Sequence, residues 1–124
     1  QSDRFSAVRR AAQVTKAVVV LKGAYTLIAE PEGGLYINPT GNRALGTGGS
    51  GDVLTGVIAG LLAQGLGAPE AAAAGAFLHG LAGDRLAQRM GEDGVLAGEI
   101  AAELPAAQRD LRSGLPDVIE ELQG

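Results

Sequence analysis

The stretch that decides the fold is NPTGNRALGTGGSGDVLTGVIAG, residues 38–60. Its first half is a loop rich in glycine, and its second half places apolar residues at the spacing of one helical face. A helix N-terminus exposes N–H groups and carries about half a positive charge, so glycines in front of it can form a nest for phosphate or another oxyanion. The segment GTGGSGD, residues 46–52, has this form. The alternative is a flexible surface loop that only caps the helix.

Asp52 stands where the loop meets the helix, and it allows two interpretations. It is either an N-cap, whose carboxylate accepts N–H bonds from the second or third helical residue, or a general base beside a bound phosphate. In the second case the nearby amides would stabilise charge on a transferring group. The residues alone do not decide between them. The loop lacks the GK[ST] of a P-loop, and its glycines do not follow a first strand as in a dinucleotide fingerprint.

Outward from this loop, the pattern predicts a helix, a strand and a hairpin before it and only helices after it. The run AVVVLKG, residues 17–23, is typical of a strand buried on both faces of a parallel sheet. The turn PEGG, residues 31–34, joins the two strands of the hairpin. The helices are expected at residues 5–14, 52–64, 68–90, 94–111 with an interruption near Pro105, and 114–123. Three strands make an incomplete sheet, so we expect the C-terminal part of a larger α/β domain.

Composition narrows the function classes. The chain has 124 residues, 46% of them hydrophobic, and a formal net charge of −4. No apolar run reaches the ~18 residues of a membrane-spanning helix. The negative charge and scarce aromatics argue against nucleic-acid binding, and the lack of cysteine with a single histidine argues against structural zinc. The polar N-terminus is no signal peptide, and the absence of cysteine suits the cytosol, so we expect a cytoplasmic protein. Because the first residue is not Met, we expect the chain to begin inside a longer gene product.

Four segments together carry a resemblance: LKGAYTLIA (21–29), residues 38–65, FLHGLAGD (77–84) and VLAGEIAAELP (95–105). In this order they resemble the C-terminal half of the NAD(P)H-hydrate dehydratases of the ribokinase-like superfamily. The resemblance implies a three-layer α/β/α domain that is helix-rich after a short strand and hairpin, with residues 1–124 forming part of this carbohydrate-kinase-like domain and its N-terminal half absent. It also implies a hydro-lyase that repairs hydrated NADH and NADPH with ADP or ATP, and Mg²⁺ accompanying the nucleotide.

The same resemblance implies roles for particular residues. Asp52 would meet the hydroxyl of the hydrated ring as the catalytic acid–base group, and no side chain would hold a metal. The nucleotide-binding residues would be Lys22, Gly23, Ala24, Tyr25, Thr26, Asn42, Gly48, Gly49, Ser50 and Gly51. Within the loop, residues 49–51 would form the anion hole. Relatives assemble, so a homo-oligomer is implied, and an upstream segment would complete the fold.

Two other function classes stay open. A ribokinase-like small-molecule kinase would use the same loop and Asp52 to phosphorylate a vitamin precursor or sugar hydroxyl. A non-enzymatic chain would only bind nucleotide or serve in assembly. Recovery of reduced-nicotinamide absorbance from hydrated NADH separates the first of these from the dehydratase, and calorimetry with ADP tests the second.

Several single residues also allow two interpretations. Lys22 ends its strand and is either a solvated lysine or a group that points into a ligand crevice. His79 lies in an apolar helix, as a packing residue or as a support of the glycine loop. The helical glycines are expected to permit close packing, since each costs about 1 kcal/mol relative to Ala; they are Gly56, Gly60, Gly75 and Gly83. The AGE at 97–99 puts a helix cap in doubt, because relatives often carry Ala-Ser-Asp there.

Overall fold

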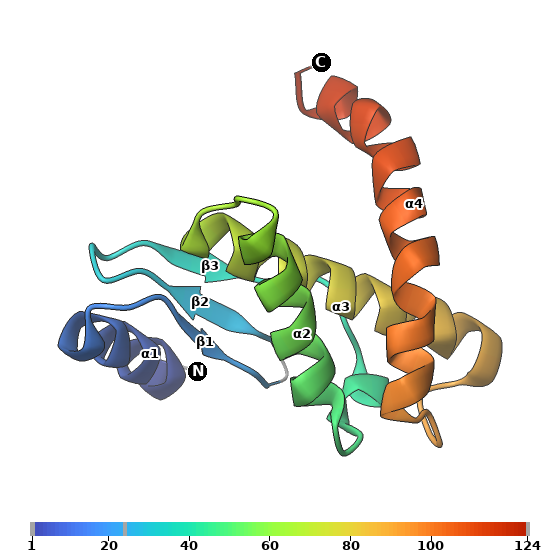
Figure 1. Ribbon diagram of the computed structural model, residues 1–124, viewed down its shortest axis with the longest axis horizontal. Helices are drawn as coiled ribbons and strands as arrows, with labels where there is room; N and C mark the ends of the chain where they lie inside the picture. Colours follow the sequence, from blue (N-terminus) through green and yellow to red (C-terminus); the bar gives the residue numbers. More distant parts are fainter. Residues whose placement is uncertain (1, 24, 124) are drawn as a thin grey trace.

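The computed structural model describes residues 2–23 and 25–123, with side chains described for 3–23 and 25–113. The order of elements is α1 (Ser2–Thr15), β1 (Val19–Leu21), β2 (Leu27–Ala29), β3 (Leu35–Ile37), the 3₁₀ helix η1 (Arg43–Gly46), α2 (Ser50–Ala63), α3 (Ala68–Met90) and α4 (Ala97–Gln123). Figure 1 shows α1 on one side of the small sheet and α2 and α3 on the other. The described chain therefore has the three-layer arrangement that the resemblance implies.

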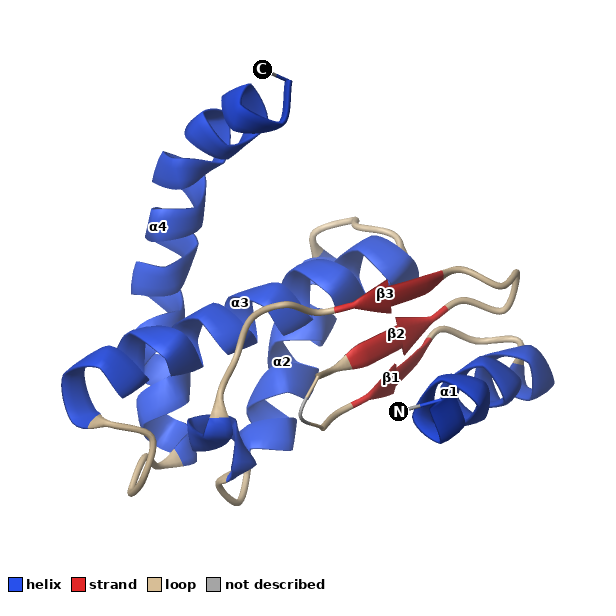
Figure 2. Cartoon of the chain, turned by 180° about the vertical axis from the view of Figure 1, so that it is seen from behind, coloured by secondary structure: helices blue, strands red, loops and turns tan. Residues whose placement is uncertain are grey.

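The sheet differs from the expected parallel one. Its order is β1-β2-β3 with antiparallel neighbours, and the hairpin pairs Leu27 with Ile37 and Ala29 with Leu35. Figure 2 shows the three strands side by side. The prediction of a fully buried parallel strand at 17–23 is wrong for β1, which pairs antiparallel with β2 and is only half-buried. Its β-branched run is still explained, because both of its faces meet helices.

Alternate residues of the strands feed two separate cores. On one face, Val8 and Ala12 of α1 pack with Leu27 and Ala29, and Val19 joins them. On the other face, Ile28 of β2 packs with Leu54 of α2 and with Ala72 and Ala76 of α3, and the half-buried Val18 and Val20 lie against this second cluster. The expected apolar side of the first helix is thereby confirmed.

The hairpin turn is as predicted. Glu30 N–H donates to the Gly34 carbonyl at 2.8 Å, and Gly33 N–H donates to the Glu30 carbonyl at 3.0 Å. Gly33 has a φ of 112°, a left-handed backbone conformation that glycine adopts without steric cost.

The C-terminal helix corrects a second expectation. α4 is one helix from Ala97 to Gln123, so the separate tail helix expected at 114–123 is wrong. It is also continuous through Pro105, although proline removes one helical hydrogen bond at a cost of about 3 kcal/mol. Ile100 and Ala107, on either side of Pro105, are fully buried in the cluster that joins α3 and α4, and this burial offsets the cost. The doubtful cap is present, since Glu99 Oε1 accepts from Leu96 N–H at 2.8 Å as in a capping box.

An ionic cluster fastens α3 to α4. Glu103 is buried and accepts from Arg85 Nε at 2.7 Å and from both terminal nitrogens of Arg89 at 2.9 Å. Arg85 also pairs with Asp110. The hydrogen bonds from Arg89 and Arg85 lower the pKa of Glu103 to about 2. The carboxylate therefore stays ionised well into acid.

Candidate active site

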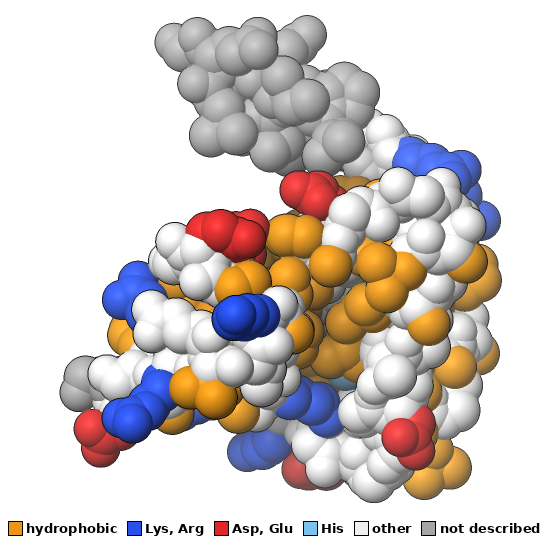
Figure 3. Space-filling view, turned by 60° about the vertical axis from the view of Figure 1, so that its left-hand side comes forward, with side chains coloured by type: hydrophobic (Ala, Val, Ile, Leu, Met, Phe, Trp, Pro, Cys, Tyr) orange, Lys and Arg blue, Asp and Glu red, His pale blue; other side chains and the backbone are white. Residues whose placement is uncertain are grey.

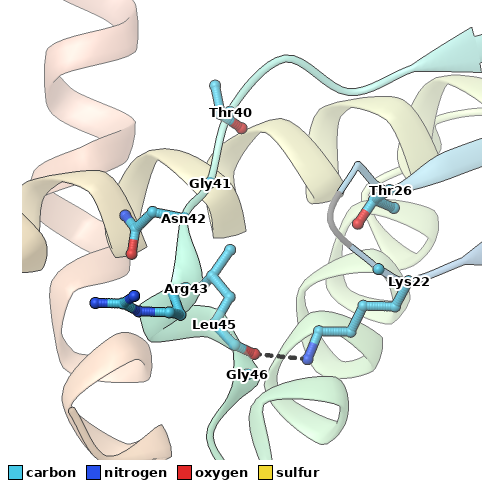
Figure 4. Close-up of a pocket in the computed structure, with 9 residues that line it drawn as sticks. Lys22, Thr26, Thr40, Gly41, Asn42, Arg43, Leu45 and Gly46 are labelled. Carbon is cyan, nitrogen blue, oxygen red and sulfur yellow. Dashed lines mark hydrogen bonds between the residues drawn. The ribbon is translucent and has the colours of Figure 1, made fainter. Parts of the chain in front are cut away.

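A cavity of about 560 Å³ lies between the end of β1 and the segment that leads into η1. Figure 4 shows Lys22 and Thr26 on one side of it and residues 40–46 on the other. Lys22 crosses the gap, because its Nζ donates to the Leu45 carbonyl at 2.8 Å. Partial burial lowers the pKa of Lys22. No acidic side chain lines the cavity, and Lys22 is its cation, because the Arg43 guanidinium pairs with Glu92 at 3.7 Å and with Asp93 at 3.6 Å. An unpaired cation among the described residues of the lining favours an anionic ligand.

Asp84 of α3 holds the far wall of this cavity in place. Its Oδ2 accepts from Gly41 N–H at 3.1 Å, and its Oδ1 accepts from Asn42 Nδ2 at 2.8 Å. Asn42 in turn caps η1, since its Oδ1 accepts from Ala44 N–H at 2.8 Å. Gly41 has a φ of 111°, which lets the chain turn beneath the carboxylate. One acidic side chain thus sets the conformation of the residues that precede η1.

Buried polar groups attach the same segment to α3. Asn38 is 2% exposed, and its Nδ2 donates to the Ala76 carbonyl at 3.1 Å. Thr40 Oγ1 donates to the Phe77 carbonyl at 2.9 Å. Side chains that bond helix carbonyls at this depth require the loop to lie directly on α3.

Glycines in α3 make this close approach possible. A Cβ at Gly80 would lie 2.6 Å from the carbonyl carbon of Thr40, and one at Gly83 would lie 2.7 Å from Leu45. The expectation of close packing is confirmed at Gly83 and also at Gly75, where a Cβ would lie 2.6 Å from Ile58. It is wrong at Gly56 and Gly60, because no described atom lies within 4 Å of a Cβ at either position.

The glycine loop leads into α2 through Gly49, an N-cap with a φ of 86°. The helix begins at Ser50 and not at Asp52, so Asp52 lies inside the first turn and the N-cap interpretation is wrong. Ser50 N–H donates to the Thr47 carbonyl at 3.2 Å, and Asp52 N–H donates to the Gly49 carbonyl at 3.1 Å. Within the described part of the chain, no backbone acceptor is recorded for the amides of Gly48, Gly49 and Gly51.

Ser50 is fully buried, and its partner is His79 of α3. His79 Nε2 lies 3.0 Å from Ser50 Oγ and 3.1 Å from the Ser50 carbonyl oxygen. Burial, with a contribution from the charge of Lys22, lowers the pKa of His79 to about 4. His79 is therefore neutral at pH 7 and supports the glycine loop, which was the alternative to a plain packing role.

Asp52 is exposed and lines a second cavity, of about 490 Å³, between β1 and α2. Its carboxylate has no hydrogen bond or ion pair to any side chain or backbone group that the structure describes. Hydrophobic residues form most of the wall; they include Val20, Leu54, Ile58 and Leu62. Figure 3 shows a face of the molecule on which hydrophobic side chains gather in a hollow. Lys22 lines this cavity as well as the first, so it stands between the two.

The residues predicted for the site are brought together only in part. Lys22, Gly23, Thr26 and Asn42 line the first cavity, whereas Gly51 and Asp52 line the second. Gly48, Gly49 and Ser50 line neither cavity. Tyr25 is 53% exposed, and its carbonyl accepts from Arg4 Nη2 at 2.9 Å. Ala24 lies outside the described residues.

Sequence reasoning missed three residues that shape the first cavity: Asn38, Thr40 and Asp84. All three lie in segments quoted for the resemblance, but a pattern gives no partner for a polar side chain. Asp84 could have been noticed as an acid at the end of an apolar helical stretch, FLHGLAGD.

The described residues contain no group of three or more acidic or histidine side chains that could hold a metal ion. None of the described helices is both long and apolar enough to cross a membrane.

Comparison with known proteins adds independent findings. Residues 1–106 match the family model described as NAD(P)H-hydrate dehydratase. The chain is 48% identical over 119 residues to the bifunctional NAD(P)H-hydrate repair enzyme of Moorella thermoacetica, covering 96% of this chain and 22% of that protein. It is 52% identical over 109 residues to the ADP-dependent (S)-NAD(P)H-hydrate dehydratase of Neisseria meningitidis serogroup B, covering 87% and 36%.

A solved structure is similar too. The ADP/ATP-dependent NAD(P)H-hydrate dehydratase of Bacillus subtilis, co-crystallised with ATP and Mg²⁺, superposes with a TM-score of 0.84 at 35% identity. The match covers 89% of this chain and 40% of that one. This chain thus spans well under half the length of these three proteins.

Proposed function

This chain belongs to the NAD(P)H-hydrate dehydratase family, and on that premise we propose that the protein containing it removes water from hydrated NADH and NADPH, with ADP or ATP as the nucleotide. The fold is the ribokinase-like α/β fold that the sequence predicts, so that prediction is confirmed. One observation carries the proposal: Lys22 stands between two cavities. The first is lined by three more of the predicted nucleotide residues, Gly23, Thr26 and Asn42, and the second is largely apolar and contains Asp52.

The first cavity fits the phosphate-bearing part of a nucleotide. Lys22 supplies positive charge, and Thr26 and Asn42 supply polar groups. The amides of Gly48, Gly49 and Gly51 offer further donors for an anion at the N-terminus of α2, outside the lining of this cavity. Ser50 is better assigned to support, because its amide is already bonded and its side chain is buried. Mg²⁺ would enter with the nucleotide's phosphates.

The second cavity fits the nicotinamide end of the substrate. Its apolar wall suits a ring, and the exposed Asp52 carboxylate can take the proton of the ring's hydroxyl as that oxygen bonds to a nucleotide phosphorus and the rest of the nucleotide is released. The carbon–oxygen bond then breaks with phosphate as the leaving group, while the ring loses a proton from the neighbouring carbon. The nucleotide supplies the phosphate chemistry that turns a poor leaving group into a better one. Lys22, between the cavities, can hold negative charge that develops near the hydroxyl.

The remaining parts of the proposal concern what surrounds this chain. Residues 1–124 form part of the domain, and an upstream segment of the same product completes the sheet and the substrate pocket. The matched relatives are all longer, which supports this. A cytoplasmic location and a homo-oligomeric assembly also belong to the proposal.

The test is an absorbance assay on the protein together with its upstream segment. Hydrated NADH with ADP or ATP should regain the reduced-nicotinamide absorbance, and Asp52→Asn should abolish this while ADP still binds. Glu32→Gln, an exposed acid in the hairpin turn, is the matched control and should behave as wild type. A stable phosphorylated product in place of recovered absorbance would favour the kinase alternative. ADP binding without any turnover would favour the non-enzymatic one.

A further inference from the structure

We infer that His79 is a positioning residue: from α3 it fixes the first turn of α2, and so sets the direction of the glycine amides and of Asp52 for the reaction. This inference rests on the proposed function of the site. It begins with a buried titratable group that the proposed chemistry does not use. His79 is 3% exposed, and its recorded hydrogen bonds within the described part of the chain go to Ser50.

The two contacts of His79 indicate which ring nitrogen carries a proton. Nε2 lies 3.1 Å from the Ser50 carbonyl oxygen, which can only accept, and 3.0 Å from Ser50 Oγ. The tautomer that makes both contacts carries its proton on Nε2. His79 therefore donates from Nε2 and holds the backbone and the side chain of one residue together.

That residue is the first of α2, and its neighbours make it the natural point of attachment. Gly49 and Gly51 flank Ser50 and have no side chains with which to anchor the turn. Glycine is also the residue with the greatest backbone freedom. Without His79, the loop would keep its sequence but lose the contact that ties it to α3.

The position of this turn affects both the proposed anion donors and the proposed base. Gly48, Gly49 and Gly51 are the proposed anion donors, and Asp52 follows Ser50 in the same helical turn. A shift of about 1 Å in catalytic groups can reduce turnover about a hundredfold. A neutral group also suits this place, because a positive charge beside a helix N-terminus is unfavourable.

The experiment compares His79→Leu, His79→Gln and Leu86→Ala in the full protein. Leu86 is a buried α3 residue packed in the cluster with α4, so its truncation matches the loss of stability without touching Ser50. For His79→Leu we expect ADP affinity to fall about 10-fold, the equivalent of one lost hydrogen bond, and kcat to fall about a hundredfold. His79→Gln, which keeps an N–H donor, should recover most of both. Leu86→Ala should lower Tm alone.

A measurement that does not depend on activity accompanies these assays. Amide hydrogen exchange at residues 48–52 should be faster in His79→Leu than in Leu86→Ala, because only the first frees the turn. Wild-type ADP affinity, kcat and exchange in His79→Leu, with only Tm lowered, would overturn the inference and leave the proposed function intact. A wild-type protein that neither binds ADP nor turns over would overturn the proposed function itself.

Discussion

Gly80→Ala tests the contact that places the cavity wall on α3. In a free helix this change is stabilising by about 1 kcal/mol, because alanine has the higher helix propensity. Here the added Cβ would lie 2.6 Å from the Thr40 carbonyl carbon and would also meet Thr40 Oγ1. A backbone atom cannot move aside as a flexible side chain does, so the segment at 40–42 must shift away from the helix.

The magnitude follows from three contributions. Overpacking of this kind costs about 1–3 kcal/mol. The shift also weakens the hydrogen bond from Thr40 Oγ1 to the Phe77 carbonyl, now 2.9 Å, which is worth about 1 kcal/mol. The gain in helix propensity offsets about 1 kcal/mol. We therefore expect a net loss of about 1–3 kcal/mol in the free energy of unfolding.

The assay is urea denaturation of the full protein, with the midpoint compared at constant m. Gly56→Ala is the matched control, since no described atom lies within 4 Å of a Cβ there, and it should stabilise by about 1 kcal/mol. ADP affinity should fall in Gly80→Ala, because Asn42 moves with the segment, and stay unchanged in the control. If both variants gained stability alike, the close approach of residues 40–42 to α3 would be refuted.

Three further predictions concern charge. The pKa of His79 is lowered from 6.5 to about 4 in the folded state, so the unfolded state binds a proton more readily between these pH values. The free energy of unfolding should therefore be unaffected by His79 above pH 6.5 and fall by about 3 kcal/mol as the pH drops toward 4. Urea titrations of His79→Leu should not show this fall. Glu103→Gln should lower Tm at neutral pH. The difference in Tm from wild type should shrink as the pH falls from 4.5 through about 2, because the wild-type carboxylate becomes protonated there. A difference in Tm that persists at pH 2 would contradict the ionic role of Glu103. Lys22→Met should weaken ADP binding at least about 10-fold. It should also raise the pKa of His79 in an NMR titration, because the charge of Lys22 contributes to lowering that pKa. An unchanged pKa of His79 would argue against the proximity of the two residues.

Local patterns predicted much of the chain, since they encode contacts between residues close in sequence. The PEGG turn, the apolar side of the first helix and the Pro69–Glu70 start of α3 all depend on neighbours within one turn. The glycine loop before α2 belongs to the same class, and its binding of an anion stays a prediction. The resemblance to the dehydratases also came from residues alone, and the family comparison agrees with it.

Where local patterns failed, a distant partner decided the outcome. β1 pairs antiparallel with β2, and α4 is continuous through Pro105 because Ile100 and Ala107 are buried against α3. A hydrophobic run reports that a residue will be buried, but not against which surface or in which strand direction.

The sequence by itself determined the family, the order of elements and the presence of an acid beside a glycine turn. Only the tertiary structure decided that Ser50 begins α2, that His79 holds it, and that Asp84 sets Gly41 and Asn42. These hydrogen bonds join residues that are 29, 42 and 43 positions apart along the chain. The physical reason is that a hydrogen bond depends on the distance and direction between two groups in space. For residues this far apart, their spacing along the chain indicates neither the distance nor the direction.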